Sequence, residues 1–168
     1  MPPGLSVRAE RPADWSSIAA VHRAAFPTQL EADLVQSLRD TGQLTASLAA
    51  IRTGQVVGHV AFSSARVVGG PLTAKIAWLA PLAVRPECQR QGIGSALVEA
   101  GLVACKTVGL DGVVVVGEPA YYGRFGFSLE AASALESRFA GPHLMALPFG
   151  PQALTGRLTE PAAFSSLA

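Results

Sequence analysis

The sequence has few cysteines and no cluster of like charges. Its 168 residues include only Cys88 and Cys105, which form neither a CxxC motif nor a set with histidine at metal-ligand spacing. Lysine and arginine are scattered and the formal net charge is +1, so the basic surface of a nucleic-acid-binding protein is not expected. Two cysteines without a disulfide framework are typical of the reducing cytoplasm. We therefore expect a cytoplasmic protein with no metal site and no nucleic-acid partner.

Hydrophobic runs long enough to span a membrane are also absent. The segment Met1–Pro12 lacks the basic region and apolar core of a secretory signal. The most apolar stretch, residues 67–84, is broken by glycine, lysine and proline, which argues against a membrane span. In contrast, 49% of the residues are hydrophobic, so the chain has enough apolar surface for one sizeable core. We expect one domain over residues 1–150 and a tail rich in proline and alanine over 151–168, either poorly ordered or wrapped on the surface.

Hydrophobic periodicity predicts a mixed α/β fold. The expected strands cover residues 5–10, 44–52, 55–68, 75–84, 111–117, 127–132 and 143–150, and the expected helices cover 12–26, 29–42, 93–108 and 119–126. A strand and two helices precede antiparallel strands and a β-α-β crossover, so the sheet is expected to be mixed and mostly antiparallel. His22 falls on the apolar face of the first helix and is expected in the core.

A glycine-containing loop between the strand 75–84 and the next helix predicts an anion site. At residues 89–95 the sequence reads Gln-Arg-Gln-Gly-Ile-Gly-Ser. The N–H groups at a helix start have no intrahelical acceptor, the helix dipole is positive there, and glycine lets an anion approach the backbone closely. A Walker loop is excluded because no lysine follows Gly94. A dinucleotide fingerprint is disfavoured because Leu97 stands at the third glycine position and seven residues, 85–91, separate the strand from Gly92.

The loop resembles the acetyl-CoA signature of the GNAT N-acetyltransferase superfamily, whose core is Gln/Arg-x-x-Gly-x-Gly/Ala. A later segment, Gly-Glu-Pro-Ala-Tyr-Tyr-Gly-Arg-Phe-Gly-Phe at 117–127, resembles the YhbS-like branch of that superfamily. The resemblance covers about residues 5–149. It implies a central sheet with a β-bulge and splayed strands, helices on both faces, and acetyl-CoA as co-substrate. The coenzyme-binding residues that it implies are Leu82, Ala83, Val84, Gln89, Arg90, Gln91, Gly92, Ile93, Gly94 and Ser95.

Pro81 interrupts the strand that leads into the loop. Because proline cannot donate to a ladder, it predicts a bulge or an edge, and a bulge would part this strand from the one at 111–117. The resemblance implies that the pantetheine arm of the coenzyme occupies such a wedge. The Leu82 N–H would then point at the thioester carbonyl, as a catalytic oxyanion donor worth about 2.7–4 kcal/mol, and Ala83 and Val84 would pair with the arm.

Two adjacent tyrosines are candidates for the proton donor to the leaving thiolate. The resemblance implies a tyrosine four residues before the glycine of the Gly-Phe pair, which is Tyr122. Tyr121 is rotated by about 100° on a helix and is expected to be a packing residue. A phenol with a pKa near 10 suits an alkaline thiolate.

The general base is open at this stage. Many relatives carry a glutamate on the central strand, but residues 75–84 contain no acid. The candidates are Glu118, His59, Glu31 and an ordered water, of which we favour the water. Cys88 lies on the phosphate side of the loop and is interpreted as a loop residue rather than a nucleophile, and Cys105 as packing.

The resemblance implies an acetyltransferase that acts on a primary amine in a ternary complex. It also implies an acceptor side that includes Phe26, Thr28, Gln29, Glu31 and the residues 139–143. A non-catalytic acyl-CoA sensor is the alternative, because the strand carboxylate is missing, and a nucleotide-binding domain is a weaker third. The acceptor, the use of longer acyl-CoAs and the oligomeric state, a homodimer included, stay open.

Overall fold

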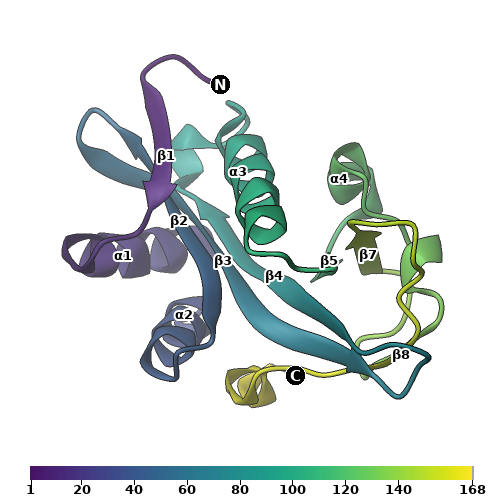
Figure 1. Ribbon diagram of the computed structural model, residues 1–168. Coiled ribbons are helices and arrows are strands. Elements are labelled where there is room, and N and C mark those ends of the chain that lie inside the picture. Colours follow the sequence, from purple (N-terminus) through teal and green to yellow (C-terminus); the bar gives the residue numbers. More distant parts are fainter. Residues whose placement is uncertain (168) are drawn as a thin grey trace.

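A computed structural model describes residues 1–167 (Figure 1). The α-helices are α1 (Trp15–Ala25), α2 (Leu30–Asp40), α3 (Ile93–Thr107) and α4 (Pro119–Tyr122). The strands are β1 (Leu5–Ala9), β2 (Leu44–Arg52), β3 (Gln55–Val68), β4 (Ala74–Val84), β5 (Gly112–Val116), β6 (Leu135–Glu136), β7 (Leu144–Pro148) and β8 (Gly156–Leu158). Short 3-10 turns lie at 12–14, 86–88, 123–125, 130–132 and 162–166.

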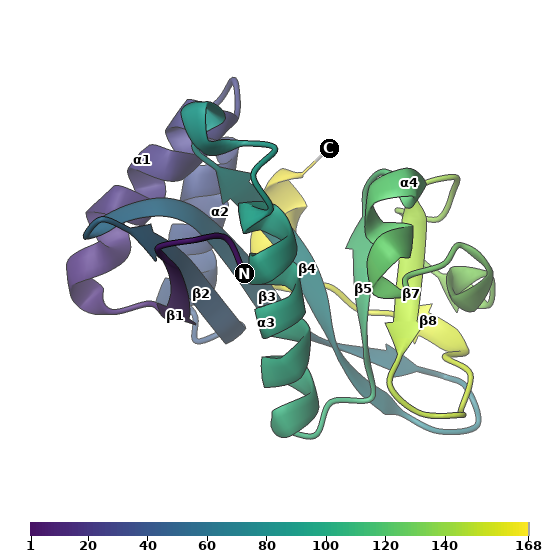
Figure 2. The same cartoon turned by 90° about the horizontal axis from the view of Figure 1, so that it is seen from above.

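The strands form one sheet in the order β1-β2-β3-β4-β5-β7, with β8 beside both β3 and β6. Within that order only β4 and β5 pair in parallel, because α3 crosses over between them. Helices α1 and α2 lie on one face and α3 on the other (Figures 1 and 2). The predicted fold class, a mixed and mostly antiparallel sheet with helices on both faces, is confirmed.

The core forms where the two faces of the sheet are covered. Phe62 on β3 is fully buried under α3, and Trp78 on β4 is buried in the cluster that α2 covers. Alternate residues of β3 face opposite sides, so Val60 belongs to the α3 cluster and Ala61 to the cluster under α1. The nearly continuous apolar sequence of β3, β4 and β5 thus reflects coverage on both faces.

The bulge predicted at Pro81 is present in β4. Val60 pairs with Leu82 and Phe62 with Leu79, so β4 has one more residue than β3 between these two pairs. The pairing of β4 with β5 ends at Trp78, just before the bulge. Beyond it, β4 stays paired with β3 and β5 with β7, so the two strands diverge and leave a wedge (Figure 2).

One segment differs from the sequence-based expectation, and the tail follows one of its two expected alternatives. Residues 127–132 were expected to form a strand, but only Ser128 bridges to Ala146, because the Ser128 hydroxyl accepts the Ala131 N–H and turns the chain into a 3-10 turn. The segment after residue 150 is packed on the domain. It supplies β8, the buried Phe164, and the Thr159 carbonyl that accepts the Trp78 indole N–H at 2.9 Å.

None of the helices within residues 1–167 is long and apolar enough to cross a membrane.

We expect Gly101→Ala to destabilise the protein by about 1–3 kcal/mol through overpacking. An added Cβ would lie 2.0 Å from Cε1 of Phe62, whose ring has no room to move in the core. Gly123→Ala is the matched control, because no atom lies within 4 Å of its added Cβ and its φ is −57°. Urea unfolding of both variants measures the difference, and equal midpoints would contradict the proposed packing of Phe62 on α3.

Candidate functional site

A cavity of about 480 Å³ lies at the start of α3, beside the part of β4 that follows the bulge. Its lining residues come from β4, the loop after it, the first turn of α3, and α4 with the turn that follows: Leu82, Val84, Cys88, Gln89, Arg90, Gly92, Ile93, Gly94, Ser95, Tyr121 and Arg124. Of the residues predicted from the sequence to hold a coenzyme, only Ala83 and Gln91 are not among them. Ala83 faces the α1 side of the sheet, and the Gln91 side chain accepts a hydrogen bond from Arg52 at 2.7 Å.

The loop backbone presents N–H groups to this cavity. Arg90 and Gly92 have left-handed φ values of 62° and 84°, and Gly92 is the N-cap of α3 without a side-chain capping bond. The first intrahelical bond runs from the Ala96 N–H to the Gly92 carbonyl, so the N–H groups of the first turn have no intrahelical acceptor. Together with the positive end of a 15-residue helix, they make the loop suited to an anion.

The two glycines of the loop have different uses. Gly92 provides the left-handed φ at the start of the helix. A Cβ on Gly94 would lie 2.7 Å from the Tyr121 hydroxyl oxygen, so Gly94 makes room for that side chain. Tyr121 therefore lines the cavity, although the sequence predicts a packing residue.

Arg124 is a cavity residue that sequence reasoning missed. Its guanidinium donates to the Ser95 hydroxyl at 3.1 Å and lies over the Tyr121 ring, with 4.6 Å between the guanidinium carbon and the ring centroid. This contact joins the turn after α4 to the first turn of α3. The spacing of three residues between Tyr121 and Arg124 was the signal that could have found it.

Tyr122 is not among the residues that line the cavity, and it packs against the core cluster under α3. Its ring packs against Gly117, where an added Cβ would be 2.4 Å from Tyr122 Cε2, and edge-on against Phe127. Burial, with a smaller contribution from Tyr121, raises the pKa of the Tyr122 hydroxyl to about 12. The phenol is therefore protonated throughout the physiological pH range.

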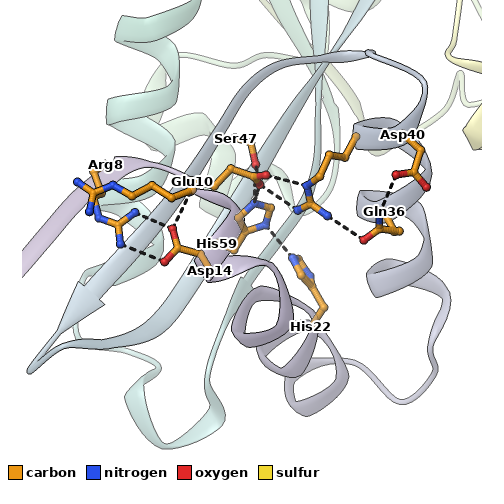
Figure 3. A network of polar contacts seen from close by, with 10 residues as sticks. Arg8, Glu10, Asp14, His22, Gln36, Asp40, Ser47 and His59 are labelled. Carbon is orange, nitrogen blue, oxygen red and sulfur yellow. Dashed lines mark hydrogen bonds and ion pairs between the residues drawn. The ribbon is translucent and has the colours of Figure 1, made fainter.

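His59 belongs to a buried polar network (Figure 3). Its Nε2 lies 2.8 Å from the Ser47 hydroxyl, which in turn donates to the Glu10 carboxylate, and its Nδ1 lies 2.9 Å from Nε2 of His22. Because the Ser47 proton goes to Glu10, His59 must donate from Nε2 and accept at Nδ1 from His22. Arg39 holds Glu10 from the other side at 2.7 Å.

The network keeps both histidines neutral. Burial lowers the pKa of His59 although Glu10 attracts its proton. Burial, with smaller electrostatic contributions from His59 and Arg39, lowers the pKa of His22 to about 3. Burial also opposes ionisation of Glu10, but hydrogen bonds from His59, Arg39 and Ser47 outweigh it and lower that pKa. The network joins α1 and α2 to β2 and β3. Both histidines are fully buried, so His59 is not accessible to an amine substrate.

The other candidates for the general base, and the two cysteines, differ in how exposed they are. The Glu118 side chain is 75% exposed, and one of its oxygens is 3.9 Å from Nδ1 of His143. Glu31 is half-buried in the first turn of α2. Cys88 lines the cavity, while burial raises the pKa of the Cys105 thiol to about 12. Within residues 1–167 no group of three or more histidine, cysteine, aspartate or glutamate residues could hold a metal ion.

The acetyltransferase (GNAT) domain profile matches residues 6–129. The chain belongs to the GNAT acetyltransferase family. It is 42% identical over 140 residues to the uncharacterized N-acetyltransferase YhbS of Escherichia coli strain K12, a match that covers 82% of this chain and 81% of that protein. The recognition of the YhbS-like branch from residues 117–127 is confirmed, and the chain is an acyltransferase.

Two solved structures share the fold along nearly the whole chain. The crystal structure of YhbS from Escherichia coli in complex with CoA has a TM-score of 0.89 and 36% identity, covering 98% of this chain and 93% of that one. A GNAT family acetyltransferase from Brucella melitensis in complex with acetyl-CoA has a TM-score of 0.81 and 35% identity, covering 95% and 97%.

The neutral histidines make stability depend on pH. A histidine whose pKa is lowered in the folded state stabilises the fold above its unfolded pKa of about 6.5, and that stabilisation is lost as the pH falls towards the folded value. Between pH 6.5 and 4.5, His22 alone should lower the free energy of unfolding by about 2 kcal/mol. Urea unfolding across this pH range should show this decrease. The variant His22→Gln keeps a donor for His59 and should reduce the slope of the free energy of unfolding against pH. An unchanged slope in the variant would show that His22 is not held neutral.

Proposed function

We propose that this GNAT acyltransferase transfers the acetyl group of acetyl-CoA to a primary amine by direct attack in a ternary complex. The observation that carries the proposal is the continuity of one cavity from the bulged strand, at Leu82 and Val84, to the glycine loop at the start of α3. A thioester arm in the wedge and a pyrophosphate on the loop would be held by one continuous surface. The complexes of the two related structures with CoA and acetyl-CoA support this assignment.

The coenzyme is proposed to lie along β4 and end at the loop. The backbone of Leu82, Ala83 and Val84 would bind the pantetheine arm as an added strand. The segment 89–95 would hold the pyrophosphate through its N–H groups. Arg124, an exposed cation on the cavity wall, adds positive charge to that of Arg90.

In the proposed transfer step, Tyr122 is the proton donor. The free amine attacks the thioester carbon, and a tetrahedral oxyanion forms near the Leu82 N–H. Collapse breaks the C–S bond, and the Tyr122 hydroxyl gives its proton to the departing thiolate. A phenol with its pKa raised to about 12 stays protonated until a basic thiolate forms beside it. The amine proton is proposed to leave through water, because β4 carries no acidic side chain and His59 is enclosed.

We expect Gly94→Ala to weaken acetyl-CoA binding about tenfold, equivalent to about 1.4 kcal/mol. The added methyl group would displace the Tyr121 hydroxyl from its position at 2.7 Å and narrow the cavity. Calorimetric titration with acetyl-CoA measures the change, with Gly123→Ala as the control because its methyl group meets no atom within 4 Å. Equal affinity in both variants would count against the loop as the coenzyme site.

We expect Tyr122→Phe to lower kcat by about 100-fold or more, with acetyl-CoA affinity unchanged. The ring keeps its packing against Gly117 and Phe127, and only the proton donor is lost. Tyr121→Phe is the matched control and should affect coenzyme affinity more than kcat, because its hydroxyl lines the cavity. The readout is thiol release from acetyl-CoA with a panel of amines. Full turnover in Tyr122→Phe would remove this residue from the reaction, and binding without thiol release by the wild type would favour an acyl-CoA sensor.

A further inference from the structure

Glu31 has a buried carboxylate oxygen that nothing in the described chain satisfies. Its Oε1 is enclosed and has no hydrogen-bond partner among residues 1–167, although the residue as a whole is only half-buried. A buried acceptor without a donor is costly, so such an oxygen usually has a partner or receives one on binding.

Helix capping does not explain Glu31. The Thr28-x-x-Glu31 spacing matches a capping box, in which the glutamate would accept the threonine N–H. In the structure the donor to the Thr28 hydroxyl is the Leu30 N–H, at 3.3 Å, rather than the Glu31 N–H that the box requires, and the N-cap residue Gln29 makes no side-chain capping bond.

Glu31 lies on the sheet face opposite α3, in the first turn of a helix that contacts β4 (Figure 1). It shares one helix face with Leu34 and Val35, three and four residues further on. Leu34 belongs to the apolar cluster of Trp78, the last β4 residue paired with β5, and Val35 to the cluster of Ala83, beyond the bulge. The first turn of α2 therefore lies near the part of β4 where β5 departs.

Charge differs between the cavity wall and α2. The cavity wall carries Arg90 and Arg124, whereas the first turn of α2 carries Glu31. Such a distribution suits an anionic coenzyme on one side and a cationic ligand on the other.

We propose that Glu31 binds the ammonium group of the acceptor and orients it before it loses its proton. The proposal rests on the proposed acetyl transfer and adds a specificity-determining residue to it. The substrate class that follows is an amine with a cationic group beside apolar contacts, since Phe26 lies in the same cluster as Val35.

The test compares Glu31→Gln with Asp33→Asn, an exposed carboxylate in the same turn that faces away and pairs with the Gln29 side chain. The probes are a lysine peptide, a peptide with a free N-terminus, a linear polyamine and an aminoglycoside. Thiol release is measured at saturating acetyl-CoA, amine binding by thermal shift with CoA present, and acetyl-CoA affinity by calorimetry.

Glu31→Gln should lower kcat/KM for the accepted amine by about 10–100-fold, mainly through KM, as expected for loss of a charged hydrogen bond. Its acetyl-CoA affinity should be unchanged and its melting temperature equal or higher, because the unsatisfied charge is gone. Asp33→Asn should behave as the wild type.

A lower melting temperature with unchanged KM would make Glu31 a structural residue and overturn the proposal. Binding of none of the four amines by the wild type, while acetyl-CoA still binds, would also overturn it. Failure of the proposed function is distinct, because acetyl-CoA would then bind neither to the wild type nor to the variants.

Discussion

The extra residue in β4 is the constraint on which the rest of the site depends. Between Leu79 and Leu82 this strand has one more residue than β3, and its pairing with β5 ends at Trp78. A straight β4 would continue to pair with β5 and close the sheet. Beyond the bulge, β4 stays paired with β3 and β5 stays paired with β7, so each strand loses its partner on one edge only. The cost of the lost ladder is thereby limited to one edge of each strand.

The two faces of the wedge are built differently. On the α3 face, glycine and backbone define the surface: Gly92 turns the chain, and Gly94 admits the Tyr121 hydroxyl. On the other face, α1 and α2 are held to the sheet by the buried network around His59, which joins residues from five elements or the segments next to them. A buried polar network of this kind favours one arrangement of its elements over others, even though Nδ1 of His22 has no hydrogen-bond partner among the described residues. The position of α1 and α2 therefore depends on two fully buried histidines and on their partly buried partners Glu10, Arg39 and Ser47.

Much of this architecture could be predicted from local sequence. Periodicity identified the central strands and the three long helices, Pro81 identified the bulge, and the glycine spacing identified the loop. The contact of Tyr121 and Arg124 with the first turn of α3 could not be predicted in the same way, because it depends on how α4 folds back after β5. The His59 network was also missed, since its members are up to 37 residues apart in direct hydrogen bonds. At 127–132, the turn set by the Ser128 hydroxyl outweighed a strand-like pattern.

The central claim is that the wedge beside the bulge holds the thioester. Amide NMR of the 15N-labelled protein, titrated in parallel with acetyl-CoA and with CoA, tests it most directly. Both ligands should perturb the amides of residues 89–95, and the difference between them should be largest at Leu82, where the acetyl carbonyl would accept the N–H. The account would be contradicted if the acetyl-dependent shifts were largest elsewhere, for example in the separate cavity of about 450 Å³ lined by Leu72, Leu110 and Phe149.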